Sequence, residues 1–555
     1  MVLRDGFKRR PARTAILLAS ILAAGAVGGY WALGSSAVTP PPALVTIDPS
    51  KASYTLPATF WGVVERMKDI GAASRAPDYV RYARALHPEV VRYSAACNPG
   101  TPAEPAPCMQ VLQRYADLLT PTGAKIYLQM QTEPLDRNGS PDDPANVQPY
   151  GSPDAQAAWL ADWAARYGAG NIVAVEWTNE PQARGGQDGW FHGDKAKIGQ
   201  WLTTMQAAYN AKLHEALPTV DVLGMAWAPG GAGTLKKEDV LPAFVGSTVP
   251  SGELQVLSVH GYGQREWNSP IPLYSDFRNP ADPTLHKKID QDKMNHYFYL
   301  PYLPGKSGYQ ASFGEWRRLL DTFGGQGTRL ALTEYAYFHP GPPGALADVA
   351  TAIISANNQK NWNLAYVVAH ALTLDDKDLD PTHKKDHGPS ILLAKLGCRT
   401  STGKCVVRSS RYFAFQQLVG PFLHNYKLQI GQGGIRVAGA GPTPSSARAN
   451  SVTKIQAAAG LSADGRRLGV LIGNFDLYNT QSVTLNLAGK VSGLVKATRL
   501  PNNHSYSSNQ PFPVTYLKAS AATASTGSNL NVNFGPGEAY LLEVPLSAPV
   551  TPATP

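Results

Sequence analysis

The sequence is poor in cysteine, in charge and in internal repetition, and each shortage excludes a class of protein. Only 4 of the 555 residues are cysteine, which is too few for a small disulfide-dense scaffold. Charged residues make up 16% and hydrophobic residues 43%, a composition that indicates a folded globular chain and excludes a disordered one. No segment repeats along the chain, so a repeat architecture is not expected.

The four cysteines form two close pairs, Cys97 with Cys108 and Cys398 with Cys405. A structural zinc site built from four cysteines usually has two C-x2-C pairs, and neither pair has that spacing. We therefore expect two local disulfides, formed in an oxidising compartment, and no metal.

One long apolar run occupies residues 15–33 and follows a basic stretch at residues 8–13. This order, with small residues at 35–37, is typical of a signal peptide or of an uncleaved signal anchor. The run is also just long enough to cross a bilayer. Both alternatives predict that residues 1–38 direct export, and that the rest is periplasmic, on the cell surface or secreted.

The net charge of +9 does not indicate a nucleic-acid partner. Much of the excess lies in five basic residues around the start of the apolar run: Arg4, Lys8, Arg9, Arg10 and Arg13. We infer no protein partner, and the chemistry described below requires no cofactor.

The pattern of apolar and turn residues divides the rest of the chain into a linker, two domains and a tail. Residues 39–55 are a proline-rich linker followed by a strand, and residues 56–424 alternate short apolar runs with helical stretches. Eight candidate strands lie at 59–64, 90–95, 125–130, 172–177, 220–225, 255–260, 330–334 and 364–370. Eight strands alternating with helices predict a (β/α)8 barrel.

Helical patterns lie between these strands, and a different pattern follows them. The candidate helices are 78–86, 110–119, 155–167, 197–216, 316–322, 345–356 and 409–419. Residues 425–546 have short alternating strands separated by Gly, Asn and Ser turns, which predicts an antiparallel β-sandwich. Residues 547–555 are expected to be an unstructured tail.

Two glutamates lie where a barrel of this kind places its reactive groups, at the carboxyl ends of the strands. Glu180 follows the fourth strand and Glu334 ends the seventh. Hydrolysis of a glycosidic bond with retention of configuration at the anomeric carbon needs two carboxyl groups about 5 to 5.5 Å apart. One acts as acid/base and the other as nucleophile. We assign these roles to Glu180 and Glu334, and expect Trp177 to lie at an apolar rim beside Glu180.

The run Asn179-Glu180-Pro181 at a strand end resembles the clan A retaining glycoside hydrolases. The resemblance implies that Asn179 hydrogen-bonds the sugar 2-hydroxyl and that His260 and Tyr262 form a sixth-strand His-x-Tyr motif. It also implies that Glu334 is the seventh-strand nucleophile.

The start of the barrel resembles one branch of that clan, the arabinofuranosidases, β-xylosidases and heparanase-like glucuronidases. The residues concerned are Ile47-Asp-Pro, Phe60-Trp-Gly-Val-Val-Glu65 and Val91-Arg-Tyr93. This likeness implies that a strand within 44–54 joins the sandwich. The sequence departs from this resemblance in two places. Strand two continues as Ser94-Ala-Ala96, where the branch often has a Pro-Gly-Gly turn, and strand eight ends as Ala369-His370-Ala371, where many members of the clan carry an aromatic sugar platform.

Other polar residues near the strand ends have two interpretations each. Arg92 is expected to pair with Glu176 inside the barrel, and direct contact with the sugar is the alternative. Glu65 either touches substrate or lies at the surface. Glu315 is the rival nucleophile, although it opens a helix, where an acidic residue favours the helix dipole.

Two loops beyond barrel strands have two interpretations each. The acidic loop 375–387 is expected to be solvated, with a metal site as the alternative, and the aromatic insertion 263–308 either lines sugar subsites or packs on itself. The leading expectation is an exported retaining glycoside hydrolase. Its rivals are a non-catalytic carbohydrate-binding or scaffold protein, and a metal-dependent hydrolase that uses His370, Asp375 and His383.

Overall fold

The computed structural model describes residues 42–66, 77–94, 116–117, 119–130, 153–181, 194–227, 237–262, 291, 313–336, 341–372, 391–396, 404–443, 452–504, 510–522 and 527–551. The apolar run at 15–33, Cys97, Cys108, Cys398 and the loop 375–387 lie outside these residues, so the disulfides and the loop's role stay predictions. Within the described residues, no helix has both the length and the apolar character needed to cross a membrane.

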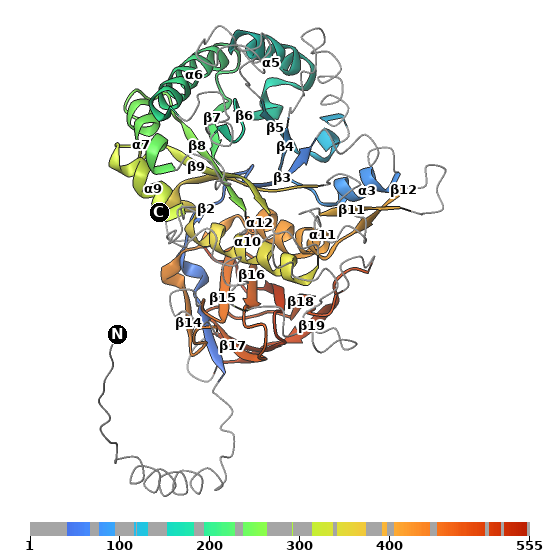
Figure 1. Ribbon diagram of the computed structural model, residues 1–555. Coiled ribbons are helices and arrows are strands. Elements are labelled where there is room, and N and C mark those ends of the chain that lie inside the picture. The colour runs from blue at the N-terminus through green and yellow to red at the C-terminus, as the bar shows by residue number, and fades with distance from the viewer. Residues whose placement is uncertain are drawn as a thin grey trace, which may run out of the picture. The chain divides into compact units, whose positions relative to one another are not determined.

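Eight parallel strands close into a barrel in the order β10-β3-β4-β5-β6-β7-β8-β9 (Figure 1). They are β3 (Trp61–Arg66), β4 (Val90–Ser94), β5 (Lys125–Gln129), β6 (Ile172–Glu176), β7 (Asp221–Trp227), β8 (Val256–Tyr262), β9 (Arg329–Ala336) and β10 (Leu364–Ala369). Alternate residues such as Val64, Val90 and Tyr127 fill the interior. The predicted (β/α)8 barrel and all eight of its strands are confirmed.

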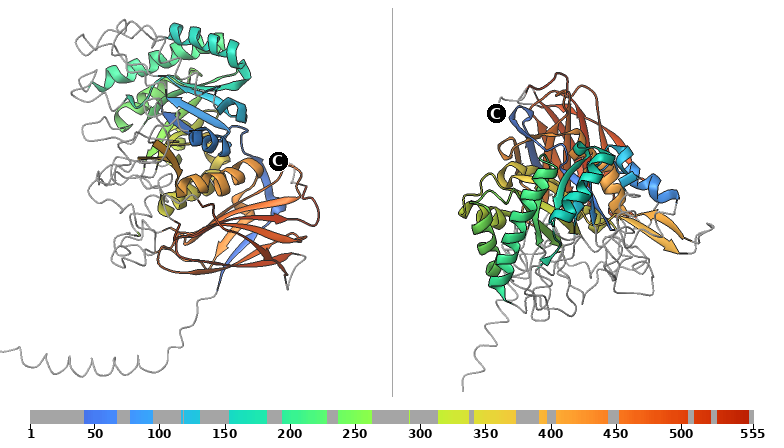
Figure 2. Two further views of the ribbon diagram at one scale, coloured as in Figure 1. Left: turned by 90° about the vertical axis from the view of Figure 1, so that its right-hand side faces the viewer. Right: turned by 90° about the horizontal axis from the view of Figure 1, so that it is seen from above.

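Helices surround the barrel, and their apolar faces pack against its outer side (Figures 1 and 2). They are α3 (Pro77–Ala85), α5 (Pro153–Tyr167), α6 (Lys195–Ala216), α7 (Lys237–Thr248), α9 (Phe313–Thr322), α10 (Pro342–Trp362), α11 (Ser410–Ala414) and α12 (Gly420–Asn425). The residue pattern did not predict α7. Pro242 lies inside this helix, and an internal proline removes a backbone hydrogen bond and normally argues against a helix.

The C-terminal domain is a sandwich of two sheets. The five-stranded sheet has the order β14-β1-β17-β21-β20 and the seven-stranded sheet the order β19-β18-β22-β16-β15-β13-β2. Its strands are β13 (Leu428–Ile430), β14 (Ile435–Ala438), β15 (Ile455–Leu461), β16 (Arg467–Asn474), β17 (Gln481–Leu487), β18 (Leu494–Leu500), β19 (Val514–Lys518), β20 (Ser520–Ala521), β21 (Ser528–Phe534) and β22 (Ala539–Pro545).

The segment before the barrel supplies one strand to each sheet of the sandwich. β1 (Ala43–Ile47) lies between β14 and β17, and β2 (Ala52–Thr55) pairs with β13. The strand expected within 44–54 is therefore present. The pairing of β1 with β17 is parallel, so the sandwich is antiparallel except at this pair.

Barrel and sandwich share one hydrophobic core along α10. The cluster that packs the helices onto the barrel also contains Ala458, Leu471 and Leu541 of the seven-stranded sheet. Asn357 of α10 donates to the carbonyl of Ala457 at 2.9 Å. A hairpin that the sequence analysis did not predict, β11 (Leu392–Leu396) and β12 (Lys404–Arg408), follows the last barrel strand.

Candidate active site

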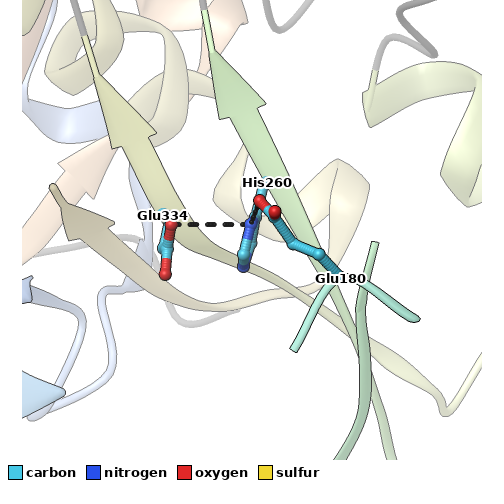
Figure 3. A group of neighbouring side chains, drawn as sticks. All are labelled: Glu180, His260 and Glu334. Atoms are coloured by element: carbon cyan, nitrogen blue, oxygen red, sulfur yellow. Dashed lines mark hydrogen bonds and ion pairs between the residues drawn. The ribbon is translucent and has the colours of Figure 1, made fainter. Parts of the chain in front are cut away.

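Two glutamates that follow or lie in different strands of the barrel meet at its mouth beside a histidine (Figure 3). Glu180 lies four residues beyond the end of β6, Glu334 lies in β9 and His260 lies in β8. One side-chain oxygen of each glutamate and one ring nitrogen of His260 lie within 4.8 Å of one another. The side chain of Glu334 is 5% exposed and that of Glu180 is 31% exposed, so Glu334 is the deeper of the two.

His260 lies between the two carboxylates, as Figure 3 shows. Its Nδ1 is 2.9 Å from Oε1 of Glu180 and 3.6 Å from Oε2 of Glu334. Burial by itself would lower the pKa of His260, but the charge of Glu334 and the hydrogen bond to Glu180 outweigh burial and raise the pKa. The two acids therefore stabilise the imidazolium form of His260 more than water does.

Arg92, on β4, supplies a positive charge to two buried carboxylates at the mouth. Its Nε donates to Glu176 Oε2 at 2.8 Å, and its Nη1 donates to Glu334 Oε1 at 2.5 Å. Burial would lower the pKa of Arg92, but the charges of Glu176 and Glu334 raise it. The expected pairing of Arg92 with Glu176 is present, and the same guanidinium also holds Glu334. All of these side chains are buried, so their hydrogen bonds fix Glu334 in one place.

Asn179 is oriented by the same arginine. Its Oδ1 accepts a hydrogen bond from Nη2 of Arg92 at 3.0 Å. With the oxygen held in this way, Nδ2 is the Asn179 atom that can donate to a hydroxyl in the mouth. This geometry is compatible with the contact to a sugar hydroxyl that the resemblance implies.

A β-bulge in β9 turns Glu334 toward the mouth. Leu332 pairs with Val259 of β8, but Glu334 pairs with the very next residue of β8, His260, so β9 has one extra residue. Strict alternation would turn Glu334 to the side of Leu332, which packs in the outer core. The extra residue is Thr333, whose hydroxyl donates to Glu176 at 3.1 Å.

The structure corrects the assignment of Trp177 as a substrate-binding residue. Its side chain is fully buried and points away from the mouth, because it follows the inward-facing Glu176 by one position. The indole stacks on Tyr209 and donates to Gln206 at 2.7 Å, both on α6. Trp177 therefore packs β6 against α6, and it forms no apolar rim beside Glu180.

The structure also corrects the assignment of Glu65, which neither touches the mouth nor lies at the surface. It is fully buried on the outer side of β3, where it accepts a hydrogen bond from the hydroxyl of Tyr79 on α3 at 2.6 Å. The backbone of Tyr262 ends β8 near the mouth, and the position of its side chain lies outside what the structure describes.

His370 is a neighbour of Glu334 that the sequence did not predict as part of a site with the two glutamates. Its Nε2 is 3.9 Å from Oε2 of Glu334, and the residue is buried just after β10. The signal for it was the strand end Ala369-His370-Ala371, where a histidine replaces the aromatic residue expected from the resemblance. Thr333 was missed because a bulge leaves no mark in the residue pattern.

Glu180, His260 and Glu334 carry the donor atoms that a divalent metal accepts. The guanidinium of Arg92 already donates to Glu334, and its charge opposes an added cation there. These residues are therefore better described as two carboxylates stabilised by Arg92 and His260 than as a metal centre. Of the residues named for a metal-dependent hydrolase, Asp375 and His383 lie outside the described residues.

No protein-family model matches the sequence, and no curated protein sequence matches it. Solved structures do match. A family GH51 arabinofuranosidase from Xanthomonas axonopodis pv. citri is similar with a TM-score of 0.62 at 12% identity, covering 91% of this chain and 99% of that one. A family 51 α-L-arabinofuranosidase from Bifidobacterium longum has a TM-score of 0.59 at 13% identity, with 91% and 100% covered.

A third solved structure has a different named activity. The glucosidase from Croceicoccus marinus matches with a TM-score of 0.53 at 15% identity, covering 91% of this chain and 100% of that one. Identities this low relate the folds alone, and the coverage extends over both barrel and sandwich. The chain therefore has the fold of the clan A glycoside hydrolases, a (β/α)8 barrel joined to a β-sandwich.

Proposed function

We propose that this protein is an exported glycoside hydrolase that cleaves a polysaccharide or oligosaccharide with retention of configuration. The observation that carries the proposal is the approach of the Glu180 and Glu334 carboxylate oxygens to within 4.8 Å. Retaining enzymes hold their carboxyl groups about 5 to 5.5 Å apart, whereas inverting enzymes leave about 6.5 to 9.5 Å for a water molecule. The short separation supports retention.

The surroundings of the two glutamates support different roles for them. Glu334 is buried and accepts a hydrogen bond from Arg92, which favours the carboxylate that a nucleophile needs. Glu180 is more exposed, so a leaving group and an incoming water molecule can both reach it. We therefore assign Glu334 as nucleophile and Glu180 as acid/base.

The reaction follows in two displacements. The Glu334 carboxylate attacks the anomeric carbon, the bond from that carbon to the leaving oxygen breaks, and the Glu180 carboxyl gives its proton to that oxygen. The Glu180 carboxylate then removes a proton from water, whose oxygen attacks the same carbon and releases Glu334. The two inversions restore the original configuration, and no cofactor takes part.

Export rests on the sequence of residues 1–38 alone, with its basic stretch, apolar run and small residues. The substrate class rests on the site and on the fold, which is shared with enzymes described as arabinofuranosidases and as a glucosidase. A carbohydrate is therefore the proposed substrate and the proposed partner.

The first experiment is a screen of the purified protein against nitrophenyl glycosides and several polysaccharides. We expect turnover of at least one nitrophenyl glycoside. With that substrate, Glu180→Ala should be rescued by azide to a glycosyl azide of retained configuration, measured by proton NMR. Glu334→Ala should be inactive, and Glu315→Ala, which changes the rival glutamate on α9, should keep full activity.

Several outcomes would contradict the proposal. An inverted product, or full activity of Glu334→Ala, would exclude double displacement through Glu334. Binding of a polysaccharide without hydrolysis of any member of the panel would indicate the non-catalytic carbohydrate-binding or scaffold alternative. Loss of activity in a chelator would indicate the metal-dependent alternative.

A further inference from the structure

The backbone of Glu180 is held in an uncommon conformation. Its φ angle is +48°, in the left-handed region that residues other than glycine enter rarely. Such a conformation persists only where neighbouring groups fix it, and it occurs most often at functional sites. The contacts of the Glu180 backbone therefore show what places its carboxyl group.

The Glu180 backbone is fixed by a bulge in β7. Its N–H donates to the carbonyl of Ala226 at 3.1 Å. Ala226 has a φ of +51° and lies where Gly224 and Trp227 pair with β8 residues only two positions apart, so β7 contains an extra residue. The bulge supplies the carbonyl that accepts from Glu180.

The bulge in turn is fixed by Ser258 of β8. The N–H of Ala226 donates to Oγ of Ser258 at 2.8 Å, and both residues are fully buried. Ser258 lies two positions before His260, so both side chains are on the inner face of the same strand. β8 thus holds Glu180 twice, by the carboxyl group through His260 and by the backbone through Ala226 and Ser258.

We propose that Ser258 is a positioning residue for Glu180, a role that rests on the proposed function of Glu180 as acid/base. The Ser258 hydroxyl fixes the Ala226 peptide, the Ala226 carbonyl fixes the Glu180 N–H, and the Glu180 carboxyl is then presented to the leaving oxygen. A side chain without an acceptor would leave a buried N–H unpaired, and the bulge would rearrange to satisfy it. Displacement of the acid by about 1 Å is enough to slow protonation strongly.

The test uses the dependence of rate on the leaving group. On an alkyl glycoside of the sugar found in the screen, Ser258→Ala should lower kcat/KM by roughly 10- to 100-fold, since this leaving group needs a well-placed acid. On the dinitrophenyl glycoside of the same sugar, the change should stay below about 3-fold, because that group leaves without protonation. Ser258→Thr, which keeps the hydroxyl, should restore most of the rate on the alkyl glycoside.

Ser355→Ala is the matched control, since it makes the same change at a fully buried serine in α10 and should leave both rates unaltered. If Ser258→Ala does not fold, Ser258→Cys, which has nearly the same shape but a weaker acceptor, should show the same preference for the activated substrate. Equal losses on both substrates, or no loss on either, would overturn the role of Ser258. Failure of the proposed function looks different, because Glu180→Ala would then keep the wild-type rate on the alkyl glycoside.

Discussion

Arg92 connects three polar residues at the mouth of the barrel. One guanidinium donates to Glu176, Glu334 and Asn179, so a single side chain on β4 orients groups from β6, β9 and the loop after β6. Glu176 and Glu334 are buried carboxylates, which are unfavourable without a counter-charge. The sequence predicted its pairing with Glu176, because alternation along both strands turns the two side chains inward.

Replacement of Arg92 by methionine should therefore cost both stability and activity. Two buried carboxylates would lose their counter-charge, and we expect the free energy of unfolding to fall by about 3 to 5 kcal/mol in urea titrations. Arg81→Met is the control, because the Arg81–Asp78 pair is exposed to solvent and its loss should leave the free energy of unfolding nearly unchanged. An Arg92→Met protein as stable as the wild type would contradict the structural role of Arg92.

The raised pKa of His260 makes stability depend on pH in a definite direction. Below the unfolded pKa of about 6.5, protonated His260 stabilises the folded state, and this contribution is lost as pH rises through the higher folded pKa. The difference in Tm between the wild type and His260→Asn should thus be larger at about pH 5.5 than at about pH 9. In a Glu180→Gln background the pH dependence should weaken, because one group that holds the proton is gone. A difference that grows with pH would contradict this assignment.

At the scale of elements, the bulges in β7 and β9 mark positions near the two glutamates that alternation along a single strand does not predict. Where alternation is uninterrupted, as it is around Arg92, Glu176 and His260, the inward positions of these residues could be read from the residue pattern. In β9 the same rule gives the wrong face for Glu334, and the extra residue Thr333 restores it. A bulge depends on hydrogen bonds from neighbouring strands, and these are not visible in one strand's own sequence.

The bulge in β7 was likewise not predictable from the sequence of its own strand. Val220 to Met225 was predicted as an ordinary strand, but the observed strand continues to Trp227 with Ala226 in a left-handed conformation. The position of Glu180 was predictable from its place after β6, whereas the backbone contact that fixes it comes from β7 and β8. Local pattern therefore identified the two glutamates, and contacts between strands set their geometry.

Trp177 was misassigned for a related reason. Proximity in sequence to Glu180 suggested proximity in space, but one step along a strand reverses the side of the sheet. Alternation from Glu176 onward places Trp177 against α6, where the structure has it.

At the scale of the whole molecule, the architecture was largely predictable. Chain length, the number of strands, and the change from alternating strands and helices to strands alone are features of the whole sequence. The eight strands, the sandwich and the joining strand were all expected from the sequence or from the resemblance. The contact between the domains was not predicted, since it depends on which face of α10 meets β15 and β16. Tyr54 of β2 also donates to the carbonyl of Ala356 on α10 at 2.5 Å, which ties the segment before the barrel to both domains.

The shared core predicts that barrel and sandwich unfold together. Separation of the two would expose the apolar surface of α10 and the facing residues of the seven-stranded sheet. Calorimetry should therefore show one transition, with a calorimetric enthalpy close to the van't Hoff enthalpy. Two resolved transitions would show that the domains are independent.

The central claim is that Glu334 forms a covalent bond to the sugar, while Glu180 protonates the leaving oxygen and then deprotonates water. The most direct measurement treats the protein with the 2-deoxy-2-fluoro derivative of the dinitrophenyl glycoside that it hydrolyses, followed by intact-mass and peptide mass spectrometry. A slow second displacement should leave one fluoroglycosyl group on the peptide that contains Glu334. A label on Glu315 or Glu180, or no label from an analogue of a substrate that is turned over, would contradict the account.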